Sequence, residues 1–535
     1  MKAKQKNAHR HFVMNRSGIE TKEEFMKKVS GRSFIKTTAA AADFKAATPL
    51  LPQGWYGLDR ANSPGYFERE FGVTDLLCRK VLAEALSRGG DFADIFFEHT
   101  VSNWIILEDG KVNKAYSDVS LGVGIRTVKG DQAGYGFTQE ISEKPMLNAA
   151  ATAATIANNG PKEIPGKFVN LETDNYYPLK TLLTSIPLES KLPLVQSVND
   201  KAFALSPIVV KVNASFHDQQ KRILVVNSEG IKAEDLQPRN YLNASVTAEK
   251  NGRRERAGWN LGGRKDFSFY SESVVDEVAR EAVERAVVLF DAVQPPAGEI
   301  PVVLGPGVTG VLLHEAIGHG MEADFNRKKV STYCTMMGKK VAEPVVTILD
   351  DGTVPELPGS INFDDEATPG QKTVLVDKGI LSSYMHDKIS ARYFKVKPTG
   401  NGRRESYQHY VQPRMRNTYM LAGSSSSEDV IKEAGNGIYV RDVSNGQVKI
   451  GEGDFAFYVS KGFMIENGKL TAPIKDINIM GNGPKMLKNI TMVADDFEMA
   501  KGGGGACGKG GQAVPVGFGQ PTCLVKSLTV GGVKG

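Results

Sequence analysis

The stretch that organises this sequence is Val311-Leu312-Leu313-His314-Glu315-Ala316-Ile317-Gly318-His319-Gly320. An apolar run at 301–304 and a Gly305-Pro306-Gly307 turn come just before it, and this order predicts a short strand that leads into a helix. Two histidines and a glutamate at the end of an apolar helix are residue types that bind a divalent metal and act on a water beside it. The segment therefore predicts both a local fold and a metal centre.

The spacing of the two histidines departs from the familiar zinc motif HExxH. His314 and His319 are five positions apart instead of four, so a regular helix would turn the second side chain roughly 140° away from the first. Gly318 suggests the remedy, because a π-bulge or an unwound last turn brings residues i and i+5 nearly into line. The chain has only 8 histidines among 535 residues, so two of them beside a glutamate and two glycines favour metal binding over chance.

A catalytic zinc site uses three protein ligands and keeps one position open, so a third ligand is needed. Cys507 is the first candidate, because the glycines on both sides of it let the backbone come close to a metal. Lys509 nearby would favour its thiolate form. Glu322 and His409 are rival third ligands, and the residues by themselves leave this choice open.

The sequence before residue 295 is rich in predicted strands. A Thr74 N-cap, apolar residues at helical spacing and Gly89-Gly90 predict a first helix, and further helices are expected at about 146–157 and 273–291. Asp109-Gly110 and Asn251-Gly252 predict hairpin turns. The expected strands are 92–99, 104–107, 112–116, 120–128, 135–138, 208–216, 222–226, 241–249 and 255–259.

A domain boundary is expected at Pro295-Pro296-Ala297-Gly298, which breaks the chain after the last of these helices. Strands dominate the rest, at 345–349, 372–376, 438–443, 455–463 and 486–493, with a hairpin over 461–469. The expected fold class is α+β: a strand-rich, multi-unit chain with an N-terminal α/β half and a β-rich C-terminal domain. The predicted domains are an extension at 1–70, an N-terminal α+β region at 71–297 that divides into about 71–160 and 170–297, and a C-terminal domain at 298–535.

Composition and charge exclude several classes of protein. The chain is 41% hydrophobic and 24% charged with a net charge of +5, which is an ordinary globular balance without the basic footprint of a nucleic-acid-binding protein. No apolar run is long enough to span a membrane. Four cysteines without a CxxC pair do not form a disulfide framework. We therefore expect neither nucleic acid as a partner nor a membrane span.

The N-terminal extension carries an ambiguous signal. Ser30-Gly31-Arg32-Ser33-Phe34-Ile35-Lys36 is similar to a twin-arginine export signal, and an alanine-rich stretch follows it. The second arginine is missing, however, and Asp43 and Lys45 interrupt the apolar run. We expect a cytoplasmic protein, with export through a degenerate twin-arginine-like N-terminus as the alternative.

Four blocks of the sequence resemble the TldD/PmbA family of zinc peptidases, also called modulators of DNA gyrase, and specifically its TldD branch. The likeness runs from about residue 72 to the C-terminus, and the extension falls outside it. Arg416 departs from the family pattern, which has a smaller residue there. The blocks are 314–325, Gly400-Asn401-Gly402-Arg403-Arg404, 413–420 and 507–517.

The resemblance implies a zinc-dependent peptidase that hydrolyses unfolded peptides or small proteins. His314, His319 and Cys507 would bind one zinc per catalytic chain, and Glu315 would be the general base of a metal-activated water and later the acid. The resemblance also implies a hollow two-chain assembly, either a homodimer or a heterodimer with a related TldE/PmbA-like chain. This chain keeps the metal motif and so resembles the catalytic member.

Peptide hydrolysis also requires a donor to the oxyanion of the tetrahedral intermediate. The positively charged or hydrogen-bonding residues in the recognised blocks and between them are the candidates for substrate binding and for this role. They are Arg403, Arg404, Tyr407, His409 and Arg414.

Two other functions compete with the peptidase. One is a zinc amidase that acts on small molecules, which a comparison of peptide and small-amide substrates would separate. The other is a non-catalytic scaffold or regulatory subunit stabilised by zinc, which would need a fourth ligand such as Cys523 or His409. A glutamate next to the first histidine argues against the scaffold.

Overall fold

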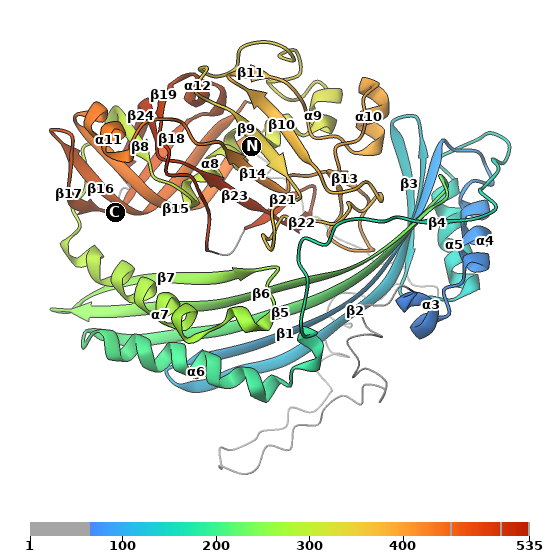
Figure 1. The fold of residues 1–535 in the computed structure, drawn as a ribbon, viewed down its shortest axis with the longest axis horizontal. Coiled ribbons are helices and arrows are strands. Elements are labelled where there is room, and N and C mark those ends of the chain that lie inside the picture. Colours follow the sequence, from blue (N-terminus) through green and yellow to red (C-terminus); the bar gives the residue numbers. More distant parts are fainter. Residues whose placement is uncertain (1–64, 450–451, 503–504, 533–535) are drawn as a thin grey trace, which may run out of the picture. The chain divides into compact units, whose positions relative to one another are not determined.

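The computed structural model describes residues 65–449, 452–502 and 505–532 (Figure 1). The export-like segment at 30–36 and most of the predicted extension therefore lie outside the described residues. Helix accounts for 24% and strand for 42% of the structure, which confirms the strand-rich α+β class. In the part of the chain that is described, no helix is long and apolar enough to cross a membrane.

A seven-stranded sheet forms the first half of the structure, in the order β3-β2-β1-β5-β6-β4 with β7 paired to β6. The predicted strand breaks near residues 100–103 and 117–119 are wrong, because the antiparallel register of β1 and β2 continues through them. Polar side chains stay in the sheet there because they bond across strands: Asn103 Nδ2 donates to Asp218 at 2.8 Å. The strands are β1 Phe92–Glu108, β2 Lys111–Lys129, β3 Gln132–Thr138, β4 Val169–Asn170, β5 Val209–Asn227, β6 Ile231–Lys250 and β7 Arg253–Gly263.

Helices cover this sheet in two groups (Figure 1). One hydrophobic cluster joins α6 Leu188–Leu205 and α7 Glu272–Val287 to the sheet strands, and a second cluster contains α3 Tyr66–Phe71, α4 Asp75–Ala85 and α5 Glu143–Ala154. The predicted N-cap is confirmed, since Thr74 Oγ1 accepts from Leu77 N at 3.2 Å. The sequence reasoning missed α6 entirely and extended α7 too far, because its last turn tightens into a 3-10 turn at Val288–Asp291.

The second half contains a seven-stranded and a six-stranded sheet and two strand pairs. Residues 486–493, predicted as one strand, are instead a helix end followed by β19, because Asn482 caps a new helix there through Lys485 N at 3.4 Å. The seven-stranded sheet contains β8 Gly298–Leu304, β15 Gly437–Lys449, β16 Asp454–Glu466, β17 Lys469–Ile474, β18 Ile477–Asn482, β19 Ile490–Val493 and β24 Cys523–Gly532. The six-stranded sheet contains β9 Ile348–Asp351, β10 Lys372–Asp377, β11 Ile380–Leu381, β14 Asn417–Met420, β20 Glu498–Met499 and β23 Gly517–Gln520.

The remaining elements of the second half are short. The strand pairs are β12 Gly402–Arg403 with β13 Gln412–Pro413, and β21 Ala506–Lys509 with β22 Gln512–Pro515. The helices are α8 Val311–Leu313, α9 Ala323–Arg327, α10 Lys388–Phe394, α11 Ser427–Ala434 and α12 Gly483–Lys488.

The hydrophobic core of the second half holds the motif helix in place. Leu312, Leu313 and Ile317 are at most 1% exposed and share one cluster with Met415 and Cys507. Burying an aliphatic side chain of this size contributes roughly 1.5–3 kcal/mol. Packing on this side therefore fixes which face of the motif helix carries its polar residues.

Buried ion pairs connect loops of the second half to the first sheet. Arg404 Nη2 donates to Asp94 of β1 at 2.9 Å, and Arg126 of β2 pairs with both Asp94 and Glu366. The side chains of all four residues have no exposed surface. These pairs place the loop around Arg404 against the sheet.

Candidate metal centre

The motif helix widens where the two histidines stand. A three-residue α-turn, Val311–Leu313, passes into a π-helical turn over His314–Gly318 and then a 3-10 turn over His319–Met321. The predicted π-bulge is therefore confirmed. Gly318 suits this turn because a Cβ there would lie 2.1 Å from Met415 Sδ, so a glycine lets the widened helix pack against the core.

A tight hairpin brings Cys507 to the same place. Cys507 lies in β21 opposite Val514 of β22, and the two strands are joined by Gly510 and Gly511 at φ +57° and +76°. Two consecutive left-handed residues are typical of a two-residue hairpin turn, and glycine adopts them without strain. The thiol is consequently buried, with 3% of the residue exposed, in a defined strand.

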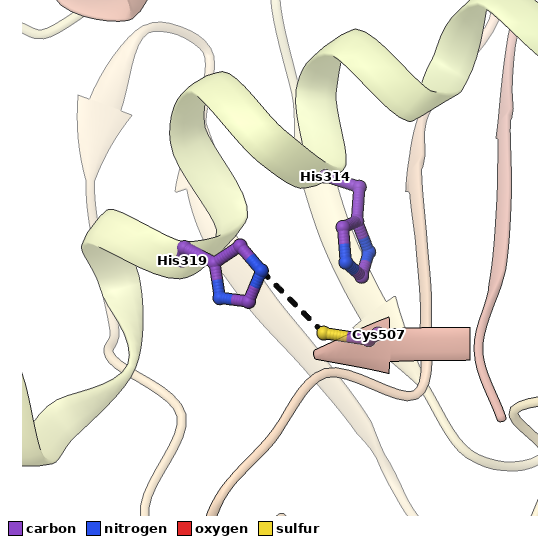
Figure 2. A group of neighbouring side chains, drawn as sticks. All are labelled: His314, His319 and Cys507. Carbon is purple, nitrogen blue, oxygen red and sulfur yellow. Dashed lines mark hydrogen bonds between the residues drawn. The ribbon is translucent and has the colours of Figure 1, made fainter. Parts of the chain in front are cut away.

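The structure brings three donor side chains together from these two segments. The ligand atoms of His314, His319 and Cys507 all lie within 4.8 Å of one another, and the side chains point toward a common centre (Figure 2). His319 Nε2 lies 3.4 Å from Cys507 Sγ. His314 Nδ1 is buried without a hydrogen-bond partner. Two imidazoles and a thiolate are donors that zinc accepts, so these residues fit such an ion.

Glu322 orients the second histidine. Its Oε2 lies 3.0 Å from His319 Nδ1, and the residue is completely buried. A carboxylate accepts at this position, so Nδ1 carries the proton and Nε2 is left free to face the cysteine. Lys509 Nζ lies 3.1 Å from Glu322 and 2.7 Å from Asp324, so its charge is held by these carboxylates instead of by the thiol.

The charges of the cluster reinforce one another. Burial alone would raise the pKa of Cys507, but His314 and His319 hold the pKa of its thiol well below the usual range. Burial would likewise raise the pKa of Glu322, but Lys509 and then His319 lower it to about 2. Burial opposes the proton on His319, yet Glu322 and Cys507 raise its pKa well above the ordinary value. A thiolate and an ionised carboxylate thus lie on either side of a protonated imidazole.

Glu315 stands at the open side of the cluster. Its Oε2 lies 3.7 Å from His319 Nε2, and 23% of its side chain is exposed, against 4% for that of His319. It is therefore the acidic residue of the cluster with a path to solvent. A carboxylate in this position can exchange protons with a water or a leaving group beside the donors.

The rival ligands lie elsewhere. Glu322 faces the outer nitrogen of His319, and His409 Nδ1 contacts Ser406 Oγ at 2.9 Å. Cys523 is buried in β24, where Gln520 Nε2 lies 3.7 Å from its sulfur and burial raises the pKa of the thiol to about 12. Within the described residues, the group of His314, His319 and Cys507 includes no fourth donor.

The five candidate oxyanion donors occupy different surroundings. Arg404 is paired with Asp94, and Tyr407 packs against β2 with its backbone N–H donating to Glu98 at 3.0 Å. His409 is held by the contact of its Nδ1 with Ser406 Oγ. Arg414 donates to the backbone oxygen of Cys507, and its Nε lies 3.8 Å from Glu322 Oε1. Arg414 therefore supports the backbone of the donor cluster.

Arg403 is the fifth candidate, and it differs from the other arginines. Its Nη1 donates to Met415 O at 2.6 Å, and 4% of the residue is exposed. No ion pair joins it to a carboxylate in the described part of the chain, in contrast to Arg404 and Arg414. Its remaining donors are therefore available to a ligand.

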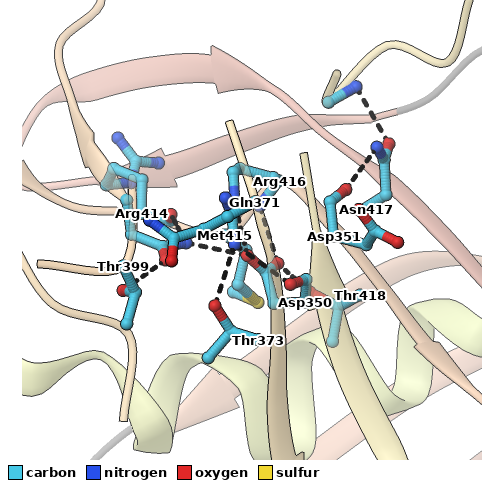
Figure 3. A network of polar contacts seen from close by, with 12 residues as sticks. Asp350, Asp351, Gln371, Thr373, Thr399, Arg414, Met415, Arg416, Asn417 and Thr418 are labelled. Carbon is cyan, nitrogen blue, oxygen red and sulfur yellow. Dashed lines mark hydrogen bonds and ion pairs between the residues drawn. The ribbon is translucent and has the colours of Figure 1, made fainter. Parts of the chain in front are cut away.

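A buried aspartate that sequence reasoning missed supports the segment carrying Arg414. Asp350 of β9 accepts from Arg416 Nε at 2.8 Å, Thr418 Oγ1 at 3.0 Å and Asn401 Nδ2 at 2.7 Å (Figure 3). The ion pair between Asp350 and Arg416 explains why Arg416 can be completely buried at a position where the resemblance predicts a smaller residue. The Asp350-Asp351 pair at the end of an apolar run gives no local signal for this role, because the partners of Asp350 are distant in sequence.

Comparisons with known proteins agree with this architecture. Family models of the PmbA/TldA metallopeptidases match domain 1 at residues 93–157, the central domain at 182–290 and the C-terminal domain at 297–532. The donor residues all lie in the C-terminal match.

Individual relatives cover nearly the whole described chain. The metalloprotease TldD homolog of Haemophilus influenzae is 41% identical over 454 residues, which are 84% of this chain and 94% of the relative. The zinc metalloprotease TldD homolog of Saccharolobus solfataricus is 26% identical over 460 residues, 85% and 99% of the two chains. The crystal structure of TldE from Thermococcus kodakarensis shares the fold, with a TM-score of 0.69 at 17% identity over 85% of this chain and 99% of that one. The chain therefore belongs to the PmbA/TldD family and is a metallopeptidase.

Proposed function

We propose that this metallopeptidase uses one zinc ion, held by His314, His319 and Cys507, to hydrolyse unfolded peptides. The observation that carries the proposal is the convergence of these three buried donor atoms within 4.8 Å of one another. The name of the Saccharolobus relative, a zinc metalloprotease, supports the choice of metal. Zinc in such a site supplies Lewis acidity that lowers the pKa of a water and polarises a peptide carbonyl.

Three side chains around the donor group have separate roles in this proposal. Glu315, partly exposed beside His319, takes a proton from the attacking water and returns it to the leaving amine. Glu322 keeps the proton of His319 on Nδ1. Arg414 holds the backbone of Cys507 in place. His314 and His319 are 2% and 3% exposed, so an extended chain reaches this site more readily than a folded protein surface does.

The likeness to a solved TldE bears on the assembly. We propose that the chain works as a dimer, either with a second copy of itself or with a TldE/PmbA-like chain. The cytoplasmic location expected from the sequence remains a prediction. The donor group has three members and a partly exposed glutamate beside it. This arrangement favours a catalytic site over a structural one, because a structural zinc usually has four protein ligands and a catalytic zinc has three.

The test is the zinc content of the purified full chain, with hydrolysis of an unstructured peptide measured in parallel. About one zinc per chain is expected for the wild type and for Glu315→Gln, and its loss is expected for His314→Ala and Cys507→Ala. All three variants should lose hydrolysis. Cys523→Ala is the matched control, because it removes a buried thiol outside the donor group and should keep both zinc and activity.

Each contrary outcome has a separate meaning. Zinc retained by Cys507→Ala would overturn the ligand assignment. Zinc without hydrolysis, even with a TldE-like chain added, would favour the scaffold function. Faster turnover of small amides than of unstructured peptides would favour the amidase.

A further inference from the structure

A cavity of about 200 Å³ lies on the other face of the hairpin that carries Cys507. Ala506, Ala513 and Pro515 line it on the hairpin side, and β1, β5 and β6 line it on the opposite side. Ala506 directly precedes Cys507 in β21, and side chains of neighbouring strand residues face opposite sides. The cavity is thus separated from the donor cluster by the thickness of one strand.

Two buried guanidinium groups line this cavity without an acidic partner. Arg264, which follows β7, is 3% exposed, and Arg403 is 4% exposed. The Arg264 Nη1 contact with Pro238 O is 3.5 Å long, its guanidinium lies 4.7 Å from the ring centre of Tyr177, and its buried Nε has no hydrogen-bond partner. Neither arginine forms an ion pair with any carboxylate of the described chain.

Other buried arginines of the protein behave differently. Arg126, Arg404 and Arg416 each lie within 2.9 Å of a buried aspartate or glutamate oxygen. This is the usual state, because a buried charge without a partner costs several kcal/mol. The unpaired state of Arg264 and Arg403 is therefore a departure that a bound anion would remove.

The acidic residues around the cavity are already engaged. Asp364 accepts from the backbone N–H groups of Gly402 and Thr368, both at 2.9 Å, and Asp365 accepts from Arg404 N at 2.7 Å. Glu98 pairs with Lys221 at 3.1 Å. Burial, opposed by Asp365 and reinforced by the neighbouring charge of Arg264, lowers the pKa of Arg403 to about 10. The two guanidinium groups therefore face one cavity whose lining carboxylates, including Glu405, which accepts from Ala513 N at 2.6 Å, bond to other groups.

We propose that Arg264 and Arg403 form a subsite that binds a carboxylate of the peptide substrate. The inference rests on the proposed function, because it takes a peptide at the metal centre as the ligand. Guanidinium groups suit a carboxylate because their planar forks match its two oxygens.

The test compares peptides that differ only in this charge. One unstructured peptide is prepared with a free C-terminal carboxylate, with a C-terminal amide, and with the amide plus one internal aspartate near the cleavage position. The wild type should cleave at least one carboxylate form with a kcat/KM about tenfold or more above that of the uncharged amide, as expected for hydrogen bonds to a charged group. The form that is preferred identifies the source of the carboxylate, terminus or side chain.

Variants connect the preference to the two arginines. Arg264→Met and Arg403→Met should reduce the ratio of kcat/KM for the preferred peptide over kcat/KM for the amide to about one, while the zinc content stays within about twofold of wild type. Each replacement removes an unpaired buried charge but leaves one backbone oxygen without its donor, Pro238 O for Arg264 and Met415 O for Arg403, so circular dichroism is used to show that both variants fold. Arg256→Met is the matched control, because Arg256 is an exposed arginine on β7, where its Nε donates to Ser245 Oγ at 3.0 Å.

The outcomes separate this inference from the proposed function. If the wild type cleaves all three peptides equally, the carboxylate subsite is refuted and the peptidase stands. If it cleaves none of them although zinc is bound, the proposed function fails first. A preference that survives in both Arg264→Met and Arg403→Met would also overturn the subsite.

Discussion

Glu322→Gln tests whether this carboxylate orients His319 or binds the metal itself. The change keeps the shape of the side chain and removes its charge. In the structure Glu322 is completely buried, 3.0 Å from His319 Nδ1 and 3.1 Å from Lys509 Nζ. Glutamine can still accept one hydrogen bond there, but its amide group then faces a cation or an N–H donor.

The size of the effect follows from the electrostatics. Lys509 and His319 lower the pKa of Glu322 from 4.5 to about 2 against the opposing effect of burial, and a shift of this size corresponds to ~3 kcal/mol of interaction. Only part of this interaction is with His319, and we expect ~1.4–2.7 kcal/mol to be lost from zinc binding. This corresponds to about a 10- to 100-fold weaker affinity, the usual cost of removing the partner of a metal-binding histidine.

The measurement is zinc affinity by competition with a chromophoric chelator, with circular dichroism to confirm folding. Glu343→Gln is the matched control, because Glu343 pairs with Lys340 at the surface and should leave the affinity unchanged. An affinity within twofold of the wild type would refute the orienting role. Complete loss of zinc, as expected for His319→Ala, would instead make Glu322 a ligand.

Three further predictions concern the support around the site. Gly318→Ala should lower the free energy of unfolding by ~1–3 kcal/mol, because the new Cβ would lie 2.1 Å from Met415 Sδ. In a double-mutant cycle measured by urea unfolding, Met415→Ala should relieve part of that cost. Strictly additive effects of the two substitutions would contradict the packing argument. Asp350→Asn should cost ~3–5 kcal/mol in urea unfolding, because it leaves the buried guanidinium of Arg416 without its charged partner; a loss below ~1 kcal/mol would show that the pair is dispensable. Burial lowers the pKa of His386 from 6.5 to about 4, so its stabilisation is complete above pH 6.5 and is lost as the pH falls toward 4, by ~2.5 kcal/mol at pH 4.5. Metal-free His386→Phe should therefore lose less stability between pH 7 and pH 4.5 than the metal-free wild type, and equal losses would argue against this titration.

Local features of the chain were predictable because their causes are local. The five-residue spacing of His314 and His319, together with Gly318, requires a widened turn, and a π-helical turn is present. The turns at Asp109-Gly110 and Asn251-Gly252 follow from residues that tolerate positive φ, and both adopt it. The strands around them were correctly placed, but their lengths were underestimated, because cross-strand partners of polar residues such as Asn103 are invisible in the sequence.

The tertiary structure decided which distant residues meet. The residues by themselves left Cys507, Glu322 and His409 as rival third donors, and the hairpin places the cysteine 188 positions away against His319 Nε2 while Glu322 takes Nδ1. The same holds for Arg403, whose lack of an acidic partner cannot be read from its neighbours in the chain. Sequence determines backbone preferences over a few residues, whereas ligand sets and unpaired charges depend on which surfaces are buried together, and only the packed chain specifies that.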